Sequence, residues 1–251
     1  MLKRILKIFL KKFGYSIIHN QYLLSLEKNL IVEEISKYEE NLLINCSKFT
    51  GTMTIPIWTL INSIKYVARN NIDGDFVEAG VWRGGNLIIY NELKKKFLLN
   101  NKIFAYDTFE GMPLPSKYDI KWNGITAFDR YKLKSNDWCK CSLEDVKKNI
   151  LSISKDLDDI KFIKGLVENT LLVEDNLPKK ISILRLDTDF YESTKIELEI
   201  LYPRLVNGGV LIIDDYGNWK GCKKAVDNYF QNKAFLIYID HGSRLYIKNN
   251  K

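Results

Sequence analysis

From residue 75 to the C-terminal end, short apolar runs alternate with stretches of helical periodicity, and this alternation restricts the fold more than any other feature of the chain. The apolar runs are Phe76–Ala79, Ile103–Tyr106, Ile160–Ile163, Ile181–Leu186, Val210–Ile213, Phe235–Ile239 and Arg244–Ile247. Helical patterns separate most of them, at about 86–99, 142–152, 168–175, 192–205 and 221–231. Alternating strands and helices form a parallel sheet covered on both faces, and the last two runs, joined by the turn 240–242, indicate an antiparallel edge. We therefore expect a doubly wound α/β fold with a seven-stranded, mostly parallel sheet and an antiparallel edge strand.

Two further segments divide the chain. Residues 1–50 show no strand pattern and include a helical pattern at 25–46, so we expect a helical N-terminal extension over 1–50 and the main domain over 51–251. Residues 112–141 interrupt the alternation and contain Pro113, Pro115 and Gly124. Long irregular segments of this kind are usually lids or binding loops, which predicts a lid insertion over one end of the sheet.

Composition excludes several classes of protein. With 46% hydrophobic and 27% charged residues the chain has ordinary globular composition, and it contains no apolar run of the ~18 residues that a membrane-spanning helix needs. The four cysteines do not form a disulfide framework in a chain this long, and the N-terminus lacks the small-residue cleavage site of a signal peptide. We therefore expect a reduced, cytoplasmic protein.

The basic charge is concentrated at the two ends of the chain. The first thirteen residues hold five basic residues and no acid, and the tail adds Lys248 and Lys251, leaving 31 of the 38 basic residues to balance the 31 acidic ones. A nucleic-acid binder normally carries a basic stripe on its folded surface, so nucleic acid is not an expected partner.

Residues 1–13 also have the pattern of a basic amphipathic helix. The apolar positions of one face are Leu2, Ile5, Leu6, Phe9, Leu10 and Phe13. Two hypotheses stay open. The helix packs on the body of the protein or on a partner subunit, or it lies on an anionic membrane surface and makes the protein peripheral at the inner membrane.

A glycine-containing turn follows the first predicted strand, in the string Glu78-Ala79-Gly80-Val81-Trp82-Arg83-Gly84-Gly85. Its spacing is neither the dinucleotide fingerprint nor a P-loop, so it fits a ligand that needs close backbone approach but has no pyrophosphate, such as S-adenosylmethionine. Asp107 ends the second predicted strand, about 27 positions after Gly80. A carboxylate at this point can accept hydrogen bonds from both hydroxyls of a ribose.

Four carboxylates follow the fourth and fifth predicted strands. Asp187 and Asp189 come after the fourth, and Asp214 and Asp215 come after the fifth. The carboxyl ends of parallel strands share one edge of the sheet, where unpaired carboxylates would raise one another's pKa values. A divalent cation removes this repulsion, and ligation by carboxylates alone selects a hard ion such as Mg²⁺, Ca²⁺ or Mn²⁺ rather than zinc.

Four strings carry a resemblance to a known family. They are FVEAGVWRGGN, YDTFEGMP, LRLDTDFYESTKIELEILYPRLVNGGVLIIDDYGNWKG and CKKAVDNYF. They resemble the macrocin O-methyltransferase family, and the similarity runs from about Thr52 to Gly242. The resemblance implies a Rossmann-like class I methyltransferase that depends on S-adenosylmethionine and Mg²⁺ and methylates sugar hydroxyls.

The family's site residues carry over only to matching positions. The resemblance implies that Asp187, Asp214 and Asp215 bind the metal and that Asp189 is the general base. The cofactor-binding residues that it implies are Thr52, Met53, Glu78, Gly80, Asp107, Thr108, Phe109 and Gly165. Leu166 stands where members of the class usually have a polar residue near the adenine, so no side-chain hydrogen bond to adenine is expected there.

The acceptor is open at this point. A small-molecule glycoside and a lipid-linked glycan are both compatible with the sequence, and Trp122 and Trp138 in the insertion are candidates for stacking on a sugar face. Two alternative functions remain: a catechol-type O-methyltransferase, and a non-catalytic glycan- or partner-binding protein on the same scaffold. The family also implies a homodimer.

Overall fold

The computed structural model describes residues 34–134, 137–231 and 233–249. The predicted amphipathic helix at 1–13 lies outside the described residues. The chain divides into two compact units after Glu40, and the sheet and the pocket considered below lie within the second unit, Asn41–Lys251. The predicted domain boundary at residue 50 stays a prediction.

The first described helix begins at Lys37. Helix α3 spans Lys37–Cys46; of the helix predicted at 25–46, residues 34–36 are not helical and residues 25–33 lie outside the described part of the chain. It begins at Lys37 because Ser36 and Glu39 form a reciprocal cap, in which the Glu39 carboxylate accepts the Ser36 N–H at 2.9 Å and the Ser36 hydroxyl accepts the Glu39 N–H at 3.3 Å. The short 3₁₀ helix η1, Ser47–Phe49, follows it.

A seven-stranded sheet forms the centre of the second unit, in the order β3-β2-β1-β4-β5-β7-β6. The strands are β1 Asp75–Ala79, β2 Ile103–Asp107, β3 Ile160–Lys164, β4 Ile181–Leu186, β5 Leu205–Ile213, β6 Ile237–Tyr238 and β7 Arg244–Ile247. The first five are parallel, and β7 pairs antiparallel with both β5 and β6. The predicted mixed sheet is thereby confirmed, with the antiparallel strand one position in from the β6 edge.

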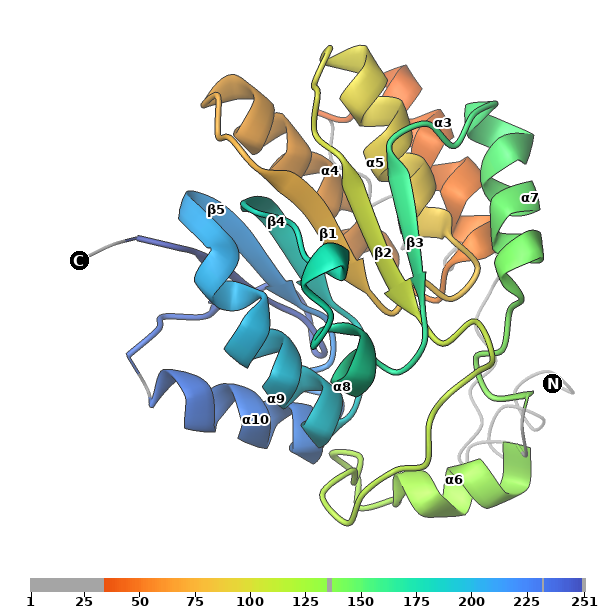
Figure 1. Cartoon of the computed structure of the whole chain (residues 1–251), viewed down its shortest axis with the longest axis vertical. Coiled ribbons are helices and arrows are strands. Elements are labelled where there is room, and N and C mark those ends of the chain that lie inside the picture. Colours follow the sequence, from red (N-terminus) through yellow and green to blue (C-terminus); the bar gives the residue numbers. More distant parts are fainter. Residues whose placement is uncertain (1–33, 135–136, 232, 250–251) are drawn as a thin grey trace, which may run out of the picture. The chain divides into compact units, whose positions relative to one another are not determined.

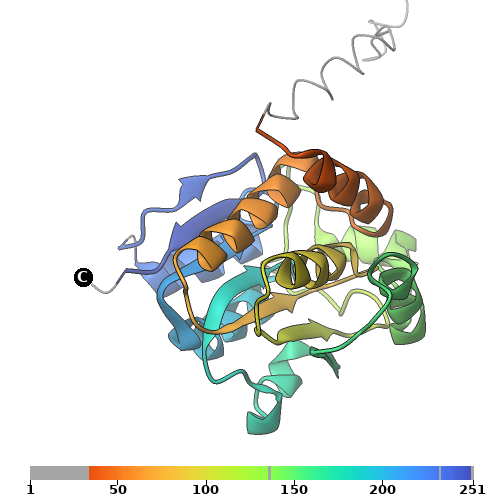
Figure 2. The same cartoon turned by 90° about the horizontal axis from the view of Figure 1, so that it is seen from above.

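Helices cover both faces of this sheet. Helices α4, α5 and α7 lie on one face and α8, α9 and α10 on the other (Figures 1 and 2). Their bounds are α4 Thr54–Arg69, α5 Gly85–Lys96, α7 Leu143–Ser154, α8 Val167–Thr170, α9 Tyr191–Ile200 and α10 Lys220–Phe230, with 3₁₀ turns η3 Glu174–Asn176 and η4 Tyr202–Arg204. No helix in the described ranges is long and apolar enough to cross a membrane.

The sheet is buried on both sides, as its composition predicts. All six residues of β4 are buried, which is typical of a central parallel strand between two helical layers. The turn after β1 packs directly on the turn after β4. A Cβ atom on Gly80, which has φ +85°, would lie 2.1 Å from the carbonyl oxygen of Asp187, so only glycine allows this approach.

The insertion 112–141 is more ordered than its prolines and glycines suggested. It contains helix α6, Ala127–Lys134, and it lies beyond the carboxyl ends of the strands (Figure 1). The Met112 N–H donates to the Trp138 carbonyl oxygen at 2.9 Å, which closes the base of the insertion. Isolated β-bridges join Ile120 to Thr126 and Lys121 to Trp219. The predicted position over one end of the sheet is therefore correct, and the predicted lack of regular structure is wrong because α6 buries Ala127 in the core.

Candidate functional site

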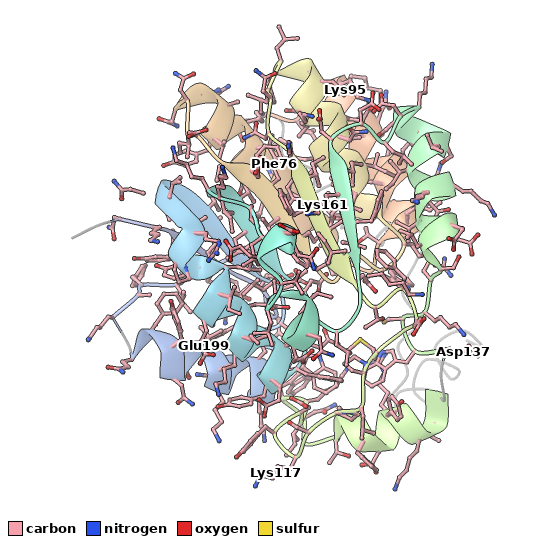
Figure 3. The ribbon with its side chains drawn as sticks, in the orientation of Figure 1. Phe76, Lys95, Lys117, Asp137, Lys161 and Glu199 are labelled. Carbon is pink, nitrogen blue, oxygen red and sulfur yellow. The ribbon has the colours of Figure 1, made fainter. Side chains whose placement is uncertain are left out.

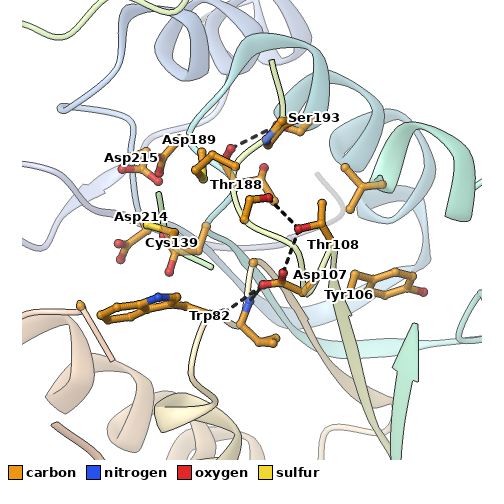
Figure 4. Close-up of a pocket in the computed structure, with 18 of the residues that line it drawn as sticks. Trp82, Tyr106, Asp107, Thr108, Cys139, Thr188, Asp189, Ser193, Asp214 and Asp215 are labelled. Atoms are coloured by element: carbon orange, nitrogen blue, oxygen red, sulfur yellow. Dashed lines mark hydrogen bonds between the residues drawn. The ribbon is translucent and has the colours of Figure 1, made fainter. Parts of the chain in front are cut away.

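A cavity of about 320 Å³ opens at the carboxyl ends of β1, β2, β4 and β5 and extends under the insertion. Most of the residues that sequence analysis assigned to the site line it. These are Thr52, Glu78, Gly80, Asp107, Thr108, Gly165, Asp187, Asp189, Asp214 and Asp215. Figure 4 shows Asp189, Asp214 and Asp215 gathered at one side and Asp107 with Thr108 at the other.

Two of the predicted cofactor residues do not line the cavity. Met53 precedes helix α4 as its N-cap, and its side chain is 70% exposed. Phe109 is buried, but its ring packs on Phe162 with centroids 6.3 Å apart. Its backbone has φ +54°, and its N–H donates to Asp107 at 2.8 Å, so Phe109 supports the pocket through its main chain and through packing.

Three carboxylates converge at the ends of β4 and β5. One oxygen each of Asp187, Asp214 and Asp215 lies within 4.8 Å of the others. The Oδ2 atom of Asp215 is buried and has no hydrogen-bond partner, which is costly unless a cation or a proton satisfies it. Burial raises the pKa values of Asp187 and Asp215 well above the ordinary range, and the neighbouring carboxylates add to the rise. These oxygen ligands fit a hard divalent cation such as Mg²⁺.

Asp189 lies beside this cluster in an unusual backbone conformation. Its φ is +68°, in the left-handed region that costs a non-glycine residue about 1–2 kcal/mol. Burial raises the pKa of its carboxyl to about 6, while a hydrogen bond with Asp215 opposes that rise. A carboxyl of this kind is ionised at neutral pH and can still accept a proton effectively.

A buried arginine that sequence analysis did not identify connects the two halves of the site. Arg185 of β4 is 1% exposed, and its Nη1 atom lies 2.7 Å from both Glu78 Oε1 and Asp187 Oδ2. Its Nη2 atom lies 2.8 Å from Asp214 Oδ1 and donates to Thr52 Oγ1 at 3.0 Å. Burial opposes the charge on the guanidinium, but the three carboxylates outweigh it and raise the pKa of Arg185 well above its ordinary value.

The opposite half of the cavity is built from main-chain donors and small residues. Asp107 Oδ2 accepts the N–H groups of Val81 and Trp82 at 2.8 and 3.0 Å. The other oxygen, Oδ1, accepts the Phe109 N–H at 2.8 Å and the Thr108 hydroxyl at 3.4 Å. A carboxylate offers about four lone-pair sites, so a ligand diol that binds Asp107 has to share or replace one of these hydrogen bonds. Glu78 Oε1 accepts from Asn86 at 2.8 Å, and its buried Oε2 has no partner.

An aromatic wall closes the end of the cavity nearest the acidic cluster. Trp138 is 4% exposed and packs on Phe190 and Trp219, with ring centroids 5.9 and 6.1 Å away. Trp122 is 60% exposed, does not line the cavity and contacts the His241 ring at 5.3 Å, so its stacking on a sugar face stays a prediction. Trp138 does line the cavity, but much of its surface is used in packing.

Comparison with known proteins points to one family. The model of the macrocin-O-methyltransferase (TylF) family matches residues 48–243. The demethyldecarbamoylnovobiocin O-methyltransferase of Streptomyces niveus is 32% identical over 182 residues, covering 70% of this chain and 67% of that protein. The 8-demethyl-8-(2,3-dimethoxy-alpha-L-rhamnosyl)-tetracenomycin-C 4'-O-methyltransferase of Streptomyces olivaceus is 33% identical over 169 residues, covering 66% of this chain and 61% of that protein. This chain therefore spans about two thirds of the length of these relatives.

Solved structures agree in fold. The structure of the O-methyltransferase NovP matches with a TM-score of 0.71 and 28% identity, covering 80% of this chain and 83% of that chain. The calicheamicin methyltransferase CalS11 matches with a TM-score of 0.58 at 18% identity, covering 86% of this chain and 95% of that chain. At that identity CalS11 supports the fold alone.

Proposed function

This chain belongs to the macrocin O-methyltransferase family, and we propose that, as an S-adenosylmethionine-dependent O-methyltransferase, it methylates a hydroxyl of a sugar. The relatives named above are O-methyltransferases, and their names give demethyldecarbamoylnovobiocin and a rhamnosyl-tetracenomycin C as the compounds on which they act. We propose in addition that the reaction uses Mg²⁺ and that Asp189 is the general base.

The observation that carries the proposal is the acidic cluster at one end of a cavity whose other end is formed by Asp107 and the turn after β1. Asp187, Asp214 and Asp215 would hold the metal, since their oxygens converge and the Oδ2 atom of Asp215 is otherwise unsatisfied. When bound, a divalent cation supplies Lewis-acid stabilisation of the negative charge that develops on the acceptor oxygen. Arg185 positions Asp187 and Asp214 from behind through one oxygen of each.

The chain's other residues bind, orient and move the proton. Asp107 and Gly165, at the ends of β2 and β3, form the side of the cavity where the nucleoside of the cofactor fits. Asp189 takes the proton of the acceptor hydroxyl at a carboxylate oxygen, and such proton transfer contributes roughly 10²–10⁴-fold. The buried aromatic wall of Trp138 and Trp219 keeps water from the same end of the cavity.

The test measures formation of S-adenosylhomocysteine by the full chain with labelled S-adenosylmethionine and Mg²⁺. Fractionated cell-envelope glycans and purified glycosides serve as sugar acceptors, and catechol serves as the aromatic diol. Methylation confined to sugar fractions supports the proposal, whereas methylation of catechol alone would establish the catechol-type alternative. Calorimetry with S-adenosylmethionine addresses the binding-protein alternative, which predicts no affinity for the cofactor.

Asp189→Asn tests the general base. We expect the variant to bind S-adenosylhomocysteine with unchanged affinity and to lose at least ~10²-fold in kcat, because an amide cannot accept the proton. The matched control is Glu192→Gln, which removes an exposed carboxylate three residues away and outside the cavity. Equal activity of the Asp189 variant and the control would remove Asp189 from this role.

We also propose that residues 1–13 contact an anionic membrane and that the protein forms a homodimer. Liposome flotation of the full chain and of a version lacking residues 1–13 tests the first point, and loss of binding in the shortened version supports it. Sedimentation equilibrium tests the second, since a single species of 29.3 kDa would rule out a dimer.

A further inference from the structure

Two basic side chains of the insertion face the cavity at the acceptor end. Lys121 and Arg130 both line it and are half-buried. The Lys121 Nζ atom lies 5.4 Å from the centroid of the Trp219 ring, and the Arg130 Cζ atom lies 4.7 Å from that of Trp138. Cation–π contacts of this kind hold the charged groups over the aromatic wall.

The backbone fixes Lys121 next to the loop that follows the acidic cluster. The Trp122 N–H donates to the Asn218 carbonyl oxygen at 3.0 Å, and the Lys220 N–H donates to the Ile120 carbonyl oxygen at 2.8 Å. This pairing joins the insertion to the segment directly after Asp215. In the sheet order, β5 lies at the opposite side of β1 from β2 and β3, where the cofactor end is built. Lys121 therefore belongs to the acceptor half of the cavity.

Neither cation is used for an ion pair within the described part of the chain. Three of the acids that line the cavity have other partners: Arg185 pairs with Asp187 and Asp214, and Asp107 accepts three main-chain N–H groups. Arg130 lines the cavity with its Cζ atom over the Trp138 ring, so its charge is directed inward. Two half-buried cations without a carboxylate partner are available to a ligand.

Two other basic residues of the insertion differ from Lys121 and Arg130 both in exposure and in their position relative to the cavity. Lys117 and Lys132 are exposed and do not line the cavity, and their Nζ atoms lie over Tyr118 and Phe128 on the outer surface. Figure 3 shows Lys117 at the outer end of the insertion. Among the basic residues of the insertion whose side chains the structure describes, only Lys121 and Arg130 line the cavity, so their direction does not follow from a general excess of basic residues in this segment.

We propose that the acceptor sugar carries a phosphate, as a phosphate ester or a diphosphate, and that Lys121 and Arg130 bind this group. The inference rests on the proposed function and adds the chemical class of its acceptor. A planar guanidinium binds phosphate oxygens in a bidentate manner and an ammonium adds a point charge, so the pair fits a group with several oxygens and nearly two negative charges. A nucleotide-linked sugar and a lipid-linked sugar share this chemistry.

The experiment is calorimetry on the full chain saturated with S-adenosylhomocysteine and Mg²⁺. The probes are inorganic phosphate and glucose 1-phosphate, with methyl glucoside as the neutral match and glucuronate as the carboxylate match. Loss of a charged hydrogen bond is worth about 1.5–3 kcal/mol, or roughly 10–100-fold in affinity. We expect glucose 1-phosphate to bind at least ~10-fold more tightly than either sugar without phosphate.

The variants assign this affinity to the two cations. Lys121→Gln and Arg130→Gln should each weaken glucose 1-phosphate at least ~10-fold, while the controls Lys117→Gln and Lys132→Gln leave it unchanged. Unchanged affinity for S-adenosylhomocysteine shows that all four variants are folded. Comparison of dTDP-glucose with a short polyprenyl diphosphate glucose in micelles then distinguishes the nucleotide-linked from the lipid-linked source.

Three results would overturn the inference. The first is that neither phosphate probe binds up to about 10 mM. The second is that the control variants weaken the affinity for glucose 1-phosphate as much as Lys121→Gln and Arg130→Gln do. The third is that glucuronate binds more tightly than glucose 1-phosphate. Failure of the proposed function is separate, because it would show as no binding of S-adenosylhomocysteine to the wild-type chain in the first step of the same experiment.

Discussion

Replacement of Arg185 by methionine tests how the acidic site is stabilised. The side chain is 1% exposed and pairs with Glu78, Asp187 and Asp214 at 2.7–2.8 Å. Removing one partner of a buried ion pair costs about 3–5 kcal/mol, because the remaining charges stay uncompensated. For a chain of this size 1 kcal/mol corresponds to about 2–4 °C in Tm, so Arg185→Met should lower Tm by about 6–20 °C.

The metal dependence of this loss separates electrostatics from packing. In Arg185→Met, the oxygens of Asp187 and Asp214 lose their cation and repel each other more strongly, so Mg²⁺ should raise Tm more in the variant than in the wild type. A pure packing defect would leave the metal-induced shift unchanged. The assay is thermal unfolding followed by circular dichroism, with EDTA and with a series of Mg²⁺ concentrations.

Two further variants control for the contributions of charge and geometry. Arg185→Lys keeps a cation but loses the fork, so its Tm should lie between those of the wild type and Arg185→Met. Arg185→Met combined with Glu78→Gln removes the most deeply buried of the unpaired carboxylates and should recover about 0.5–3 kcal/mol. If Arg185→Met melts within about 2 °C of the wild type, or responds to Mg²⁺ no more than the wild type, the reasoning is refuted.

Three other predictions concern Gly80, Glu197 and the metal. Gly80→Ala should destabilise the fold by about 2–5 kcal/mol in urea titrations, since its Cβ atom would meet a backbone oxygen. Gly124→Ala is the control: it has φ +89° and no atom within 4 Å, so it should cost only about 1–2 kcal/mol. Equal losses in the two variants would contradict this prediction. Burial raises the pKa of Glu197 well above 4.5, so the stability it contributes is present below pH 4.5 and is lost as pH rises toward the folded-state value. Glu197→Gln should therefore gain stability over the wild type at pH 8 but not at pH 4, and a pH-independent difference would be inconsistent with that cause. EDTA should abolish methyl transfer. It should leave the affinity for S-adenosylhomocysteine within a few-fold of its value in Mg²⁺, because Asp107 and Gly165 lie apart from the acidic cluster. Full turnover in EDTA would exclude a role for a metal.

The strand ends are the part of the site that sequence reasoning predicts well. A carboxylate after a buried strand has a fixed position, because the carboxyl ends of parallel strands meet at one edge. Asp187, Asp214 and Asp215 therefore come together as expected, and Gly80 lies where a close backbone approach requires glycine. These relations depend on strand direction and on local spacing, and both can be read from one chain.

The remaining features depend on contacts between distant segments. Arg185 is visible in the sequence as a cation within an apolar strand, but its partners Glu78 and Asp214 lie on two other strands. The family resemblance implies that Phe109 binds the cofactor, yet Phe109 does not line the cavity, because its backbone has a positive φ and its ring packs on Phe162. In the insertion, the direction of a lysine or tryptophan is set by α6 and by the pairing with 218–220, for which the sequence has no periodic signal.

The difference between the strand-end residues and the residues of the insertion determines how far the substrates of the relatives predict the acceptor of this chain. The family match covers residues 48–243, which include Asp189 and Asp215, the residues that we propose as general base and metal ligand. In the proposal above the acceptor contacts the insertion, from which Lys121, Arg130 and Trp138 line the cavity. A neutral glycoside would leave two half-buried cations without a counter-charge, which is unfavourable when water is excluded. The charge of the insertion is therefore a better guide to the acceptor than the substrates of relatives that share about a third of the residues.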